Sequence, residues 1–443
     1  MNTTAARLEL RDIQRGVLSP RPTPYAATYL LFRIDDPADG RQLMRRAAGV
    51  VTSAADEASA LGDTSVSVAV TYHGLRTLGL PQRSLDTFAW EFRQGMAARH
   101  AALGDTADSA PERWEPPLGS PDVHVAVTVV APDRGLLDAA IDRARPAYAT
   151  LPGVTAIWRQ ECHALTSETE PFGYRDGVSH PAVKGSGIPG SNPLEPPLEP
   201  GEFVLGYPDE LGGTQRIQPE ILGRNGSYVA FRKLHQRVAA FRRYLAEHAT
   251  TPGDEAMLAA KLMGRWRSGA PLALSPHRDD PALGADPHRR NAFGYADDPT
   301  GYVTPGGSHI RRTNPRDAAV AGEPRLHRMI RRGTVYGPPL PDGVLDDDGA
   351  DRGIMFAFVG AHLGRQFEFV QSEWINDGVF FGAGGARDPI AGRHSPEHAG
   401  YTIPRRPLRR RLEGLPQFVV TRGGEYCFMP GLRALRWLGD QAA

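Results

Sequence analysis

The first segment that could carry chemistry is EPFGYRDGVSHP, residues 170–181, at the start of an irregular stretch. Glycines on both sides of Asp176 allow tight backbone geometry and the close approach of a flat ligand. The Asp176 carboxylate could therefore be presented into a cavity. An Asx-type turn, in which this carboxylate only accepts backbone hydrogen bonds, is the alternative.

The second segment is GGSHIRRTNPRD, residues 306–317, in which one histidine, His309, lies among three arginines. A zinc site is not expected here, because a local trio of His, Asp and Glu ligands is missing. His309 could instead be the single axial ligand of a haem iron, with a nearby arginine pairing with a propionate. The alternative is an ordinary surface histidine in a basic loop.

The third segment, HRMIRRGTVYGPPL at 327–340, contains Arg331 and Arg332. If this segment is a strand, neighbouring side chains point to opposite faces, so one of the two arginines points inward. A buried guanidinium is costly unless it meets an anion or a developing negative charge. A solvated pair on an edge strand is the alternative.

Other catalytic motifs are absent from the sequence. We find no Walker-type phosphate loop, no HExxH and no GxSxG. The glycine-rich GAGGARDPIAG at 382–392 does not lead from a clear strand into a helix, so it predicts a flexible surface loop rather than a dinucleotide site. The two cysteines, Cys162 and Cys427, exclude a disulfide scaffold and a CxxC metal pair.

The composition is that of an ordinary globular protein. In 443 residues, 51 Lys and Arg balance 51 Asp and Glu, so nucleic acids and anionic membranes are not expected as partners. No apolar run approaches the ~18 residues of a membrane helix. The N-terminal residues show no export signal, and with the low cysteine content this predicts a cytoplasmic protein. The length predicts roughly two or three domains.

The elements that must position these segments come in a repeated order. In the first half, alternating or aromatic-rich runs predict strands, and an apolar period near 3.6 residues predicts helices. The expected order is strand 27–34, a helix from 37, strand 65–72, strand 123–131, helix 134–151 with a bend at Pro146, and strand 155–165. This β-α-β-β-α-β order is that of a ferredoxin-like domain.

The second half repeats the order with longer insertions. The expected elements are strand 226–234, helix 235–249, strands within 330–337 and 352–361, a helix over 363–377 and a closing strand over 417–431. We therefore expect an α+β protein with two ferredoxin-like domains, at 1–170 and 171–443. The Gly- and Pro-rich stretches 171–223 and 275–309 also contain aromatics and histidines, which predicts that they form the walls of a pocket.

Taken together, the three chemical segments resemble the dye-decolorizing peroxidases, a family of haem peroxidases. PFGYRDG is similar to the family's GxxDG signature, SHIRRTNPR to the segment with the proximal histidine, and MIRRGTVYG to the segment with the distal arginine. The likeness extends from about residue 11 to 435, and the long insertions are similar to the longer-chain branch. The resemblance implies two ferredoxin-like halves that enclose a haem b, with the second half carrying most of the haem site.

The resemblance also implies a role for each matching residue. The implied roles are His309 as axial iron ligand, Asp176 as distal acid–base group, Arg331 (alternatively Arg332) as distal arginine, Arg311 as propionate partner, and Phe356 and Phe358 as an apolar wall over the iron. For the two phenylalanines, simple core packing is the alternative. The carboxylate expected to hold the proximal imidazole is not assigned by the sequence.

The implied activity is the reduction of hydrogen peroxide coupled to the oxidation of dyes, phenols or other bulky aromatic compounds. Bulky dyes do not fit a buried pocket, so surface tyrosines or tryptophans are expected to pass electrons inward, and six Trp and 13 Tyr leave the choice open. The alternative is a haem carrier or iron-releasing protein without fast peroxide turnover, which needs neither Asp176 nor an inward arginine. A homo-oligomer is compatible with the sequence.

Overall fold

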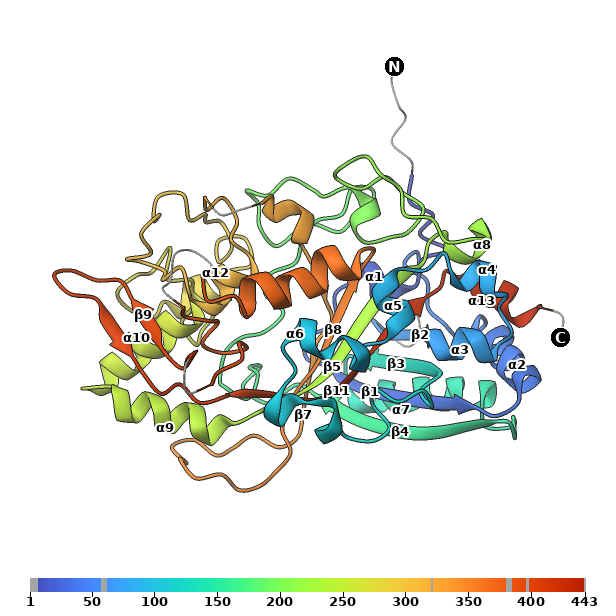
Figure 1. Cartoon of the computed structure of the whole chain (residues 1–443), viewed down its shortest axis with the longest axis horizontal. Coiled ribbons are helices and arrows are strands. Elements are labelled where there is room, and N and C mark those ends of the chain that lie inside the picture. Colours follow the sequence, from blue (N-terminus) through green and yellow to red (C-terminus); the bar gives the residue numbers. More distant parts are fainter. Residues whose placement is uncertain (1–6, 57–61, 320–321, 380–384, 396–397, 442–443) are drawn as a thin grey trace, which may run out of the picture.

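The computed structural model of the chain describes residues 7–56, 62–319, 322–379, 385–395 and 398–441 (Figure 1). The strands are β1 (Ala26–Ile34), β2 (Ser65–Thr71), β3 (Val125–Ala131), β4 (Val154–His163), β5 (Ser227–Gln236), β6 (Ile330–Arg331), β7 (Thr334–Tyr336), β8 (Gly353–Gly360), β9 (Tyr401–Ile403), β10 (Arg410–Leu412) and β11 (Val419–Met429). Nine of them form one antiparallel sheet in the order β4-β1-β3-β2-β11-β5-β8-β6, with β7 also paired to β8. β9 and β10 form a separate hairpin.

The helices lie before, between and after these strands. The α-helices are α1 (Arg15–Leu18), α2 (Pro37–Ala47), α3 (Tyr72–Thr77), α4 (Gln82–Leu85), α5 (Trp90–Gln94), α6 (His100–Leu103), α7 (Arg134–Ala144), α8 (Glu220–Gly223), α9 (Val238–His248), α10 (Pro252–Met263), α11 (Pro281–Ala285), α12 (His309–Thr313) and α13 (Leu432–Gly439). The helix expected over 363–377 forms as two consecutive π-helical segments, Leu363–Glu368 and Val370–Ile375. Within the described residues, no helix combines the length and the apolarity that a bilayer crossing requires.

Each half of the sheet has the strand order of a ferredoxin-like unit. The first half is ordered β4-β1-β3-β2, with α2 between β1 and β2 and α7 between β3 and β4. The second half, β11-β5-β8-β6, repeats that order, with α9 and α10 after β5 and the π-helical segments after β8. The two ferredoxin-like halves predicted from the sequence are therefore confirmed.

Strands β2 and β11 join the two halves into one sheet, pairing Val70 with Phe428 and Thr71 with Cys427. The predicted domain boundary at residue 170 falls shortly after β4 ends. However, α13 from the end of the chain packs against α2 near its beginning. The division into two domains thus stays a prediction, because packing and strand pairing both cross it.

Alternation along each strand divides its side chains between two cores. On β1, Leu30 and Phe32 belong to the core under the helices, whereas Tyr29 belongs to the core on the other face. On that second face the sheet curls until β4 and β7 pack against each other. Thr334 Oγ1 then donates to Tyr29 Oη (3.2 Å), and the Val335 N–H donates to the Tyr25 hydroxyl (2.7 Å). Side chains, rather than a strand ladder, therefore close the sheet into a barrel.

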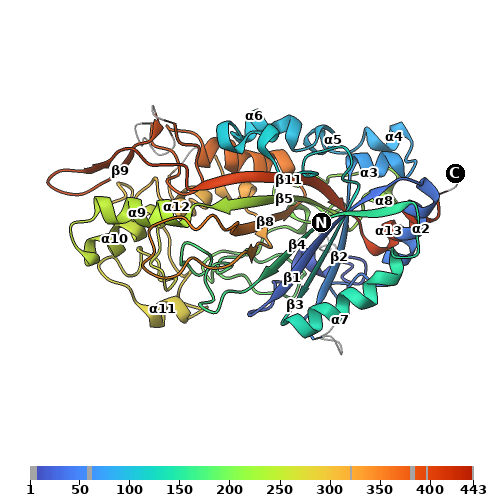
Figure 2. The same cartoon turned by 90° about the horizontal axis from the view of Figure 1, so that it is seen from below.

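The long strands of the second half lead away from this barrel. Figure 2 shows β11, β5 and β8 side by side, with α9, α10 and α12 at the end of the molecule from which the β9–β10 hairpin projects. The strand expected over 330–337 is split into β6 and β7 around Arg332 and Gly333. The Gly- and Pro-rich stretches form mostly irregular loops around this end.

One buried carboxyl group in the sheet makes the fold sensitive to pH. Glu425 on β11 is only 6% exposed and accepts one hydrogen bond, from the Gly119 N–H (2.5 Å). Burial raises its pKa from 4.5 to about 8, against the opposing effect of that hydrogen bond. Between these two pH values the folded chain keeps a proton that the unfolded chain releases, so the free energy of unfolding falls as the pH rises.

We therefore expect Glu425→Gln to gain stability relative to the wild type as the pH rises from 5 to 8. Glutamine has the shape of the protonated acid and does not titrate. The gain should be roughly 1 to 3 kcal/mol, from ~1.4 kcal/mol per pKa unit less local relaxation. Urea unfolding of both proteins at the two pH values measures it, and a pH-independent difference would show that Glu425 does not carry this proton.

Candidate functional site

A cavity of ≈ 320 Å³ lies against the second half of the sheet. Its walls come from β5, β6 and β8, from α12, from both π-helical segments, and from the irregular loop that follows β4. Three of the residues singled out from the sequence, Asp176, His309 and Arg331, line it together. Segments more than 130 positions apart in the sequence thus meet at one site.

His309 begins α12 and is held by a carboxylate from far along the chain. Its Nδ1 lies 2.9 Å from Oδ2 of Asp388, which is completely buried. The other carboxylate oxygen, Oδ1, accepts from the N–H groups of Ile390 (2.8 Å) and Ala391 (2.9 Å). Burial raises the pKa of Asp388, but His309 and these N–H groups outweigh it, and the pKa lies below its ordinary value.

An ionised Asp388 fixes the tautomer of His309. The carboxylate can only accept, so the proton of the neutral imidazole must sit on Nδ1. The second ring nitrogen, Nε2, is then left with a free lone pair, and none of the described residues hydrogen-bonds to it. A histidine in this state in a cavity wall is ready to ligate a metal.

Asp388 corrects one of our sequence interpretations. It belongs to the glycine-rich segment 382–392, which was expected to be a flexible surface loop. Positions 382–384 lie outside the described residues, but Asp388 is fully buried and Ile390 nearly so. No sequence pattern could find this partner, because 79 residues separate it from His309.

Asp176 and Arg331 lie near each other on another part of the cavity wall. The Asp176 side chain is 30% exposed and lies 3.4 Å from Nη2 of Arg21. Arg331 donates to the Ser179 carbonyl (3.2 Å), in the same loop as Asp176. Burial lowers the pKa of Arg331 and the charge of Asp176 opposes this effect, yet an arginine remains protonated at any working pH.

The Asx turn considered for Asp176 is not what the structure shows. Within the described residues, the Asp176 carboxylate accepts no hydrogen bond from a backbone N–H, and the Glu170 carboxylate accepts such bonds instead. The Glu170 carboxylate accepts from the N–H groups of Phe172 (3.0 Å) and Tyr174 (2.9 Å) and from Nε2 of Gln236 (2.6 Å). Burial raises the pKa of Glu170 to about 7 despite these bonds. Glu170 thus shapes the turn and leaves Asp176 free to face the cavity.

Arg332 points the opposite way from Arg331, as alternation in a strand requires. It lies outside the ≈ 320 Å³ cavity and donates to the carbonyls of Gly16, Val17 and Leu18, at the C-terminal end of α1. Its guanidinium is therefore occupied in tying β6 to α1. Of the two arginines left open by the sequence, only Arg331 faces the cavity.

Two expected cavity residues lie elsewhere. Arg311 is fully buried outside the cavity wall, donating to Asp298 Oδ2 (3.2 Å) and the Thr304 carbonyl (2.7 Å). Phe358 is likewise absent from the wall and packs on Phe367 in the core, whereas Phe356 does line the cavity. Arg311 follows His309 by two positions on α12, so its side chain points away from the face that carries His309; its expected role toward a propionate stays a prediction.

Two other arginines of the wall were missed by sequence reasoning. Arg265 and Arg316 donate only to carbonyl groups and to the Asn291 amide, and neither forms an ion pair with a described carboxylate. Burial lowers the pKa of Arg265 to about 9. Buried cations of this kind are costly without an anion, so they are the groups best placed to meet the acidic groups of a bound cofactor.

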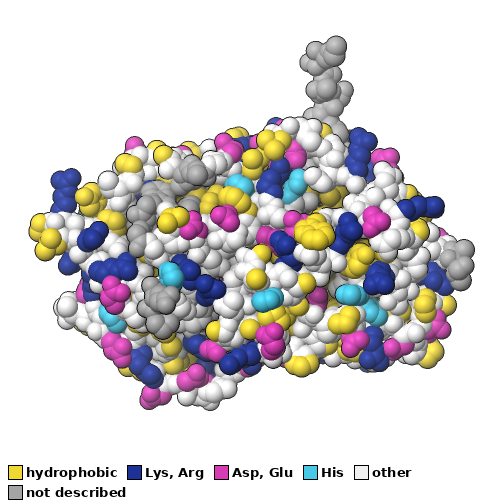
Figure 3. All heavy atoms as spheres, viewed as in Figure 1, with side chains coloured by type: hydrophobic (Ala, Val, Ile, Leu, Met, Phe, Trp, Pro, Cys, Tyr) yellow, Lys and Arg dark blue, Asp and Glu magenta, His cyan; other side chains and the backbone are white. Residues whose placement is uncertain are grey.

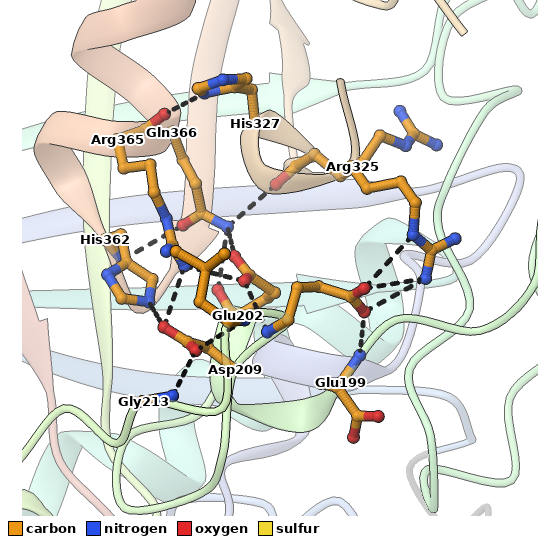
Figure 4. Close-up of polar contacts among 12 residues, drawn as sticks. Glu199, Glu202, Asp209, Gly213, Arg325, His327, His362, Arg365 and Gln366 are labelled. Atoms are coloured by element: carbon orange, nitrogen blue, oxygen red, sulfur yellow. Dashed lines mark hydrogen bonds and ion pairs between the residues drawn. The ribbon is translucent and has the colours of Figure 1, made fainter. Parts of the chain in front are cut away.

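A buried cluster of ion pairs anchors the loop that contains Glu202 and Asp209 (Figure 4). Glu202, Asp209 and His362 have the ligand types and spacing of a metal site. However, Nη2 of Arg365 already donates to Glu202 Oε1 (2.8 Å) and Asp209 Oδ2 (3.2 Å). Because this cation sits on both carboxylates, we assign the cluster to loop anchoring: it ties the segment after residue 199 to the first π-helical segment.

The relatives that match this chain over most of its length are peroxidases. Residues 12–150 match a family model described as the DyP dimeric alpha+beta barrel domain. The chain is 31% identical over 408 residues to a dye-decolorizing peroxidase of Mycetinis scorodonius, covering 84% of this chain and 76% of that protein. It is 30% identical over 475 residues to a multifunctional dye peroxidase of an Amycolatopsis species, covering 98% and 97%. A solved dye-decolorizing peroxidase in complex with 2,6-dimethoxyphenol gives a TM-score of 0.85 at 27% identity, over 98% of this chain and 100% of that one.

The hydrogen bonds of Asp388 generate a specific prediction for Asp388→Asn. If the amide oxygen takes the place of Oδ1, the amide NH₂ faces Nδ1 of His309, which must then give up its proton to Nε2. The reverse orientation sets the NH₂ against the N–H groups of Ile390 and Ala391. We expect the His309 tautomer to switch, as measured by nitrogen-15 NMR of the ring.

His327 is the internal control for this experiment, because its Nδ1 bonds a backbone carbonyl, that of Arg365 (2.6 Å). Its tautomer should be the same in both proteins. An unchanged His309 spectrum in Asp388→Asn would mean that Asp388 does not set the proton position.

Proposed function

The chain belongs to the dye-decolorizing peroxidase family, and on that premise we propose that its cavity holds haem b and that Asp176, Arg331 and His309 carry the reaction with peroxide. The chain is thus a haem peroxidase, which reduces hydrogen peroxide at the expense of aromatic donors. The site assignment rests on Nε2 of His309, which lies in the same cavity as Asp176 and Arg331. Asp388 holds the ring proton on Nδ1 and so leaves the lone pair of Nε2 available. A haem carrier would need neither Asp176 nor Arg331.

The residues of the cavity fit a haem. Nε2 of His309 would bind the haem iron. Arg265 and Arg316 would meet the propionates, since both lack a carboxylate partner among the described residues. Phe356 and Phe367 supply apolar wall. Haem b, which is held without thioether bonds, agrees with the cysteines, because Cys162 and Cys427 are buried in the barrel core and not in the cavity wall.

When bound, haem supplies the iron that binds peroxide and takes up the electrons of the donors. Hydrogen peroxide needs two electrons and two protons to become two molecules of water, so two donor molecules each lose one electron. The Asp176 carboxylate accepts the proton from one peroxide oxygen and returns it to the other. The Arg331 guanidinium stabilises the negative charge on the departing oxygen. A carboxylate can do this in mildly acidic solution, where a histidine would already be protonated.

Asp176→Asn tests the proton transfer. Asparagine keeps the size and much of the hydrogen bonding of aspartate but cannot accept the proton, so the variant should retain haem and lose a large part of the peroxide rate. Stopped-flow mixing with peroxide, with the haem content of each protein measured in parallel, checks this loss. A wild-type rate in the variant would leave Asp176 with a structural role only.

Arg331→Leu tests the charge stabilisation. The variant should bind haem normally yet react with peroxide about 10²- to 10³-fold more slowly, the usual loss on removal of one charge-stabilising donor. Arg331→Lys keeps the charge without the planar guanidinium, so its rate of reaction with peroxide should lie between those of the wild type and Arg331→Leu. If Arg331→Leu reacts as fast as the wild type while its haem content is unchanged, the assignment of this arginine is wrong.

A further inference from the structure

The β9–β10 hairpin projects from the end of the molecule with its base firmly anchored (Figure 1). Tyr401, Ile403 and Leu412 of its strands pack into the core formed with α9 and α10. The Tyr401 hydroxyl donates to the Lys261 carbonyl (2.9 Å), and Nη1 of Arg410 pairs with Asp254 (2.8 Å) on α10. The turn between the strands is therefore presented on a rigid support.

This turn concentrates positive charge on a chain whose net charge is zero. Residues 401–414, YTIPRRPLRRRLEG, hold five arginines and one carboxylate, Glu413. Arg410 and Arg411 are paired with Asp254 and Glu413. The other three, Arg405, Arg406 and Arg409, are exposed and form no ion pair with any carboxylate of the described residues.

Exposed apolar and aromatic surface lies between these three charges. Leu408, at the tip of the turn, is 76% exposed, and Tyr302, whose ring lies 5.5 Å from the Arg406 guanidinium, is 42% exposed. In the space-filling view, Lys and Arg side chains gather around apolar ones at the end of the molecule that the hairpin forms (Figure 3). One exposed leucine carries little weight by itself, but Leu408 adjoins Arg409 in the sequence, and Arg405 donates to the Leu408 carbonyl (3.0 Å).

We propose that Arg405, Arg406, Leu408 and Arg409 form a docking site for aromatic molecules that carry sulfonate or carboxylate groups. A guanidinium group binds such anions through its fork of N–H donors and also stacks on aromatic rings. Leu408 and the Tyr302 ring supply apolar contact for the rest of the molecule. Three free charges are fewer than the four to eight basic residues of a typical anionic-membrane site, and too few for strong phosphate-backbone binding.

The role of this docking site rests on the proposed function. One cofactor-sized ligand uses up a cavity of ≈ 320 Å³, so a bulky reductant must bind outside it. Tyr302, whose ring lies 5.5 Å from the Arg406 guanidinium, precedes His309 by seven residues, so its Cα lies no more than ~25 Å from that of the proposed iron ligand. The hairpin would thus hold anionic aromatic reductants near the haem without admitting them to its pocket.

Binding is tested on the holoenzyme with naphthalene-1,5-disulfonate, a redox-inert probe, by isothermal titration. The triple variant Arg405→Gln, Arg406→Gln, Arg409→Gln should bind it about tenfold more weakly than the wild type, and added salt should abolish the difference. The control triple Arg11→Gln, Arg83→Gln, Arg143→Gln removes the same charge from exposed positions elsewhere and should bind like the wild type. Equal weakening in both triples, or none in the hairpin triple, would overturn the site.

Leu408→Ser separates aromatic recognition from simple anion binding. The variant should weaken the binding of the disulfonate and leave the binding of inorganic sulfate unchanged. If the disulfonate affinity is unaffected, the aromatic part of the proposal is wrong. Hairpin-dependent binding of duplex DNA or of vesicles containing anionic lipid, with no binding of the disulfonate, would assign the surface to a different partner and overturn the proposal.

Steady-state kinetics test whether the docking site contributes to the oxidation of anionic donors. The hairpin triple should raise KM about tenfold for a sulfonated dye and leave kcat and KM for an uncharged phenol as in the wild type. An unchanged KM for the dye contradicts the docking role. If no donor is oxidised at all, the peroxidase assignment fails, whereas the titration with the inert probe still decides whether the docking site exists.

Discussion

The hydrogen bond between His309 and Asp388 is the interaction on which the site depends. It decides which ring nitrogen carries the proton, and so whether the cavity wall offers a ligand at all. The bond also requires two distant segments to meet. Arg312, three residues after His309 on α12, donates to the carbonyls of Trp374 (2.6 Å), Asp377 (3.0 Å) and Ala386. The loop with Asp388, the second π-helical segment and α12 are thereby held together.

The sheet supplies the remaining geometry. β6 is only two residues long and pairs Arg331 with Phe358 of β8. Because neighbouring side chains point to opposite faces, Arg331 faces the cavity and Arg332 faces α1. This short edge strand thus places one arginine in the candidate site, while the next arginine holds α1. Glu170 does the same for the neighbouring loop, since it takes up the backbone N–H groups that would otherwise compete for Asp176. Asp176 and Arg331 thus both line the cavity, Asp176 beside Arg21 and Arg331 donating to the Ser179 carbonyl.

Local patterns in the sequence were enough to predict the strand and helix order of both halves, because a period of two or of 3.6 is a property of short windows. The motif resemblance was enough to select Asp176, His309 and Arg331, which the structure brings into one cavity; their roles stay predictions. Asp388 could not be found this way, since a contact over 79 residues leaves no local trace. The same holds for the pairing of β2 with β11 and for the presence of Arg265 and Arg316, but not Arg311, in the cavity wall, because these depend on the direction of side chains in three dimensions.

The measurement that tests the central claim most directly is a haem titration of the haem-free protein and of His309→Gly, followed by absorption spectroscopy with and without added imidazole. The account predicts that the wild type binds haem, that the variant binds it poorly, and that free imidazole, entering the space left by the side chain and meeting Asp388, restores the wild-type spectrum. A His309→Gly protein that binds haem with the affinity and spectrum of the wild type, without imidazole, would contradict it.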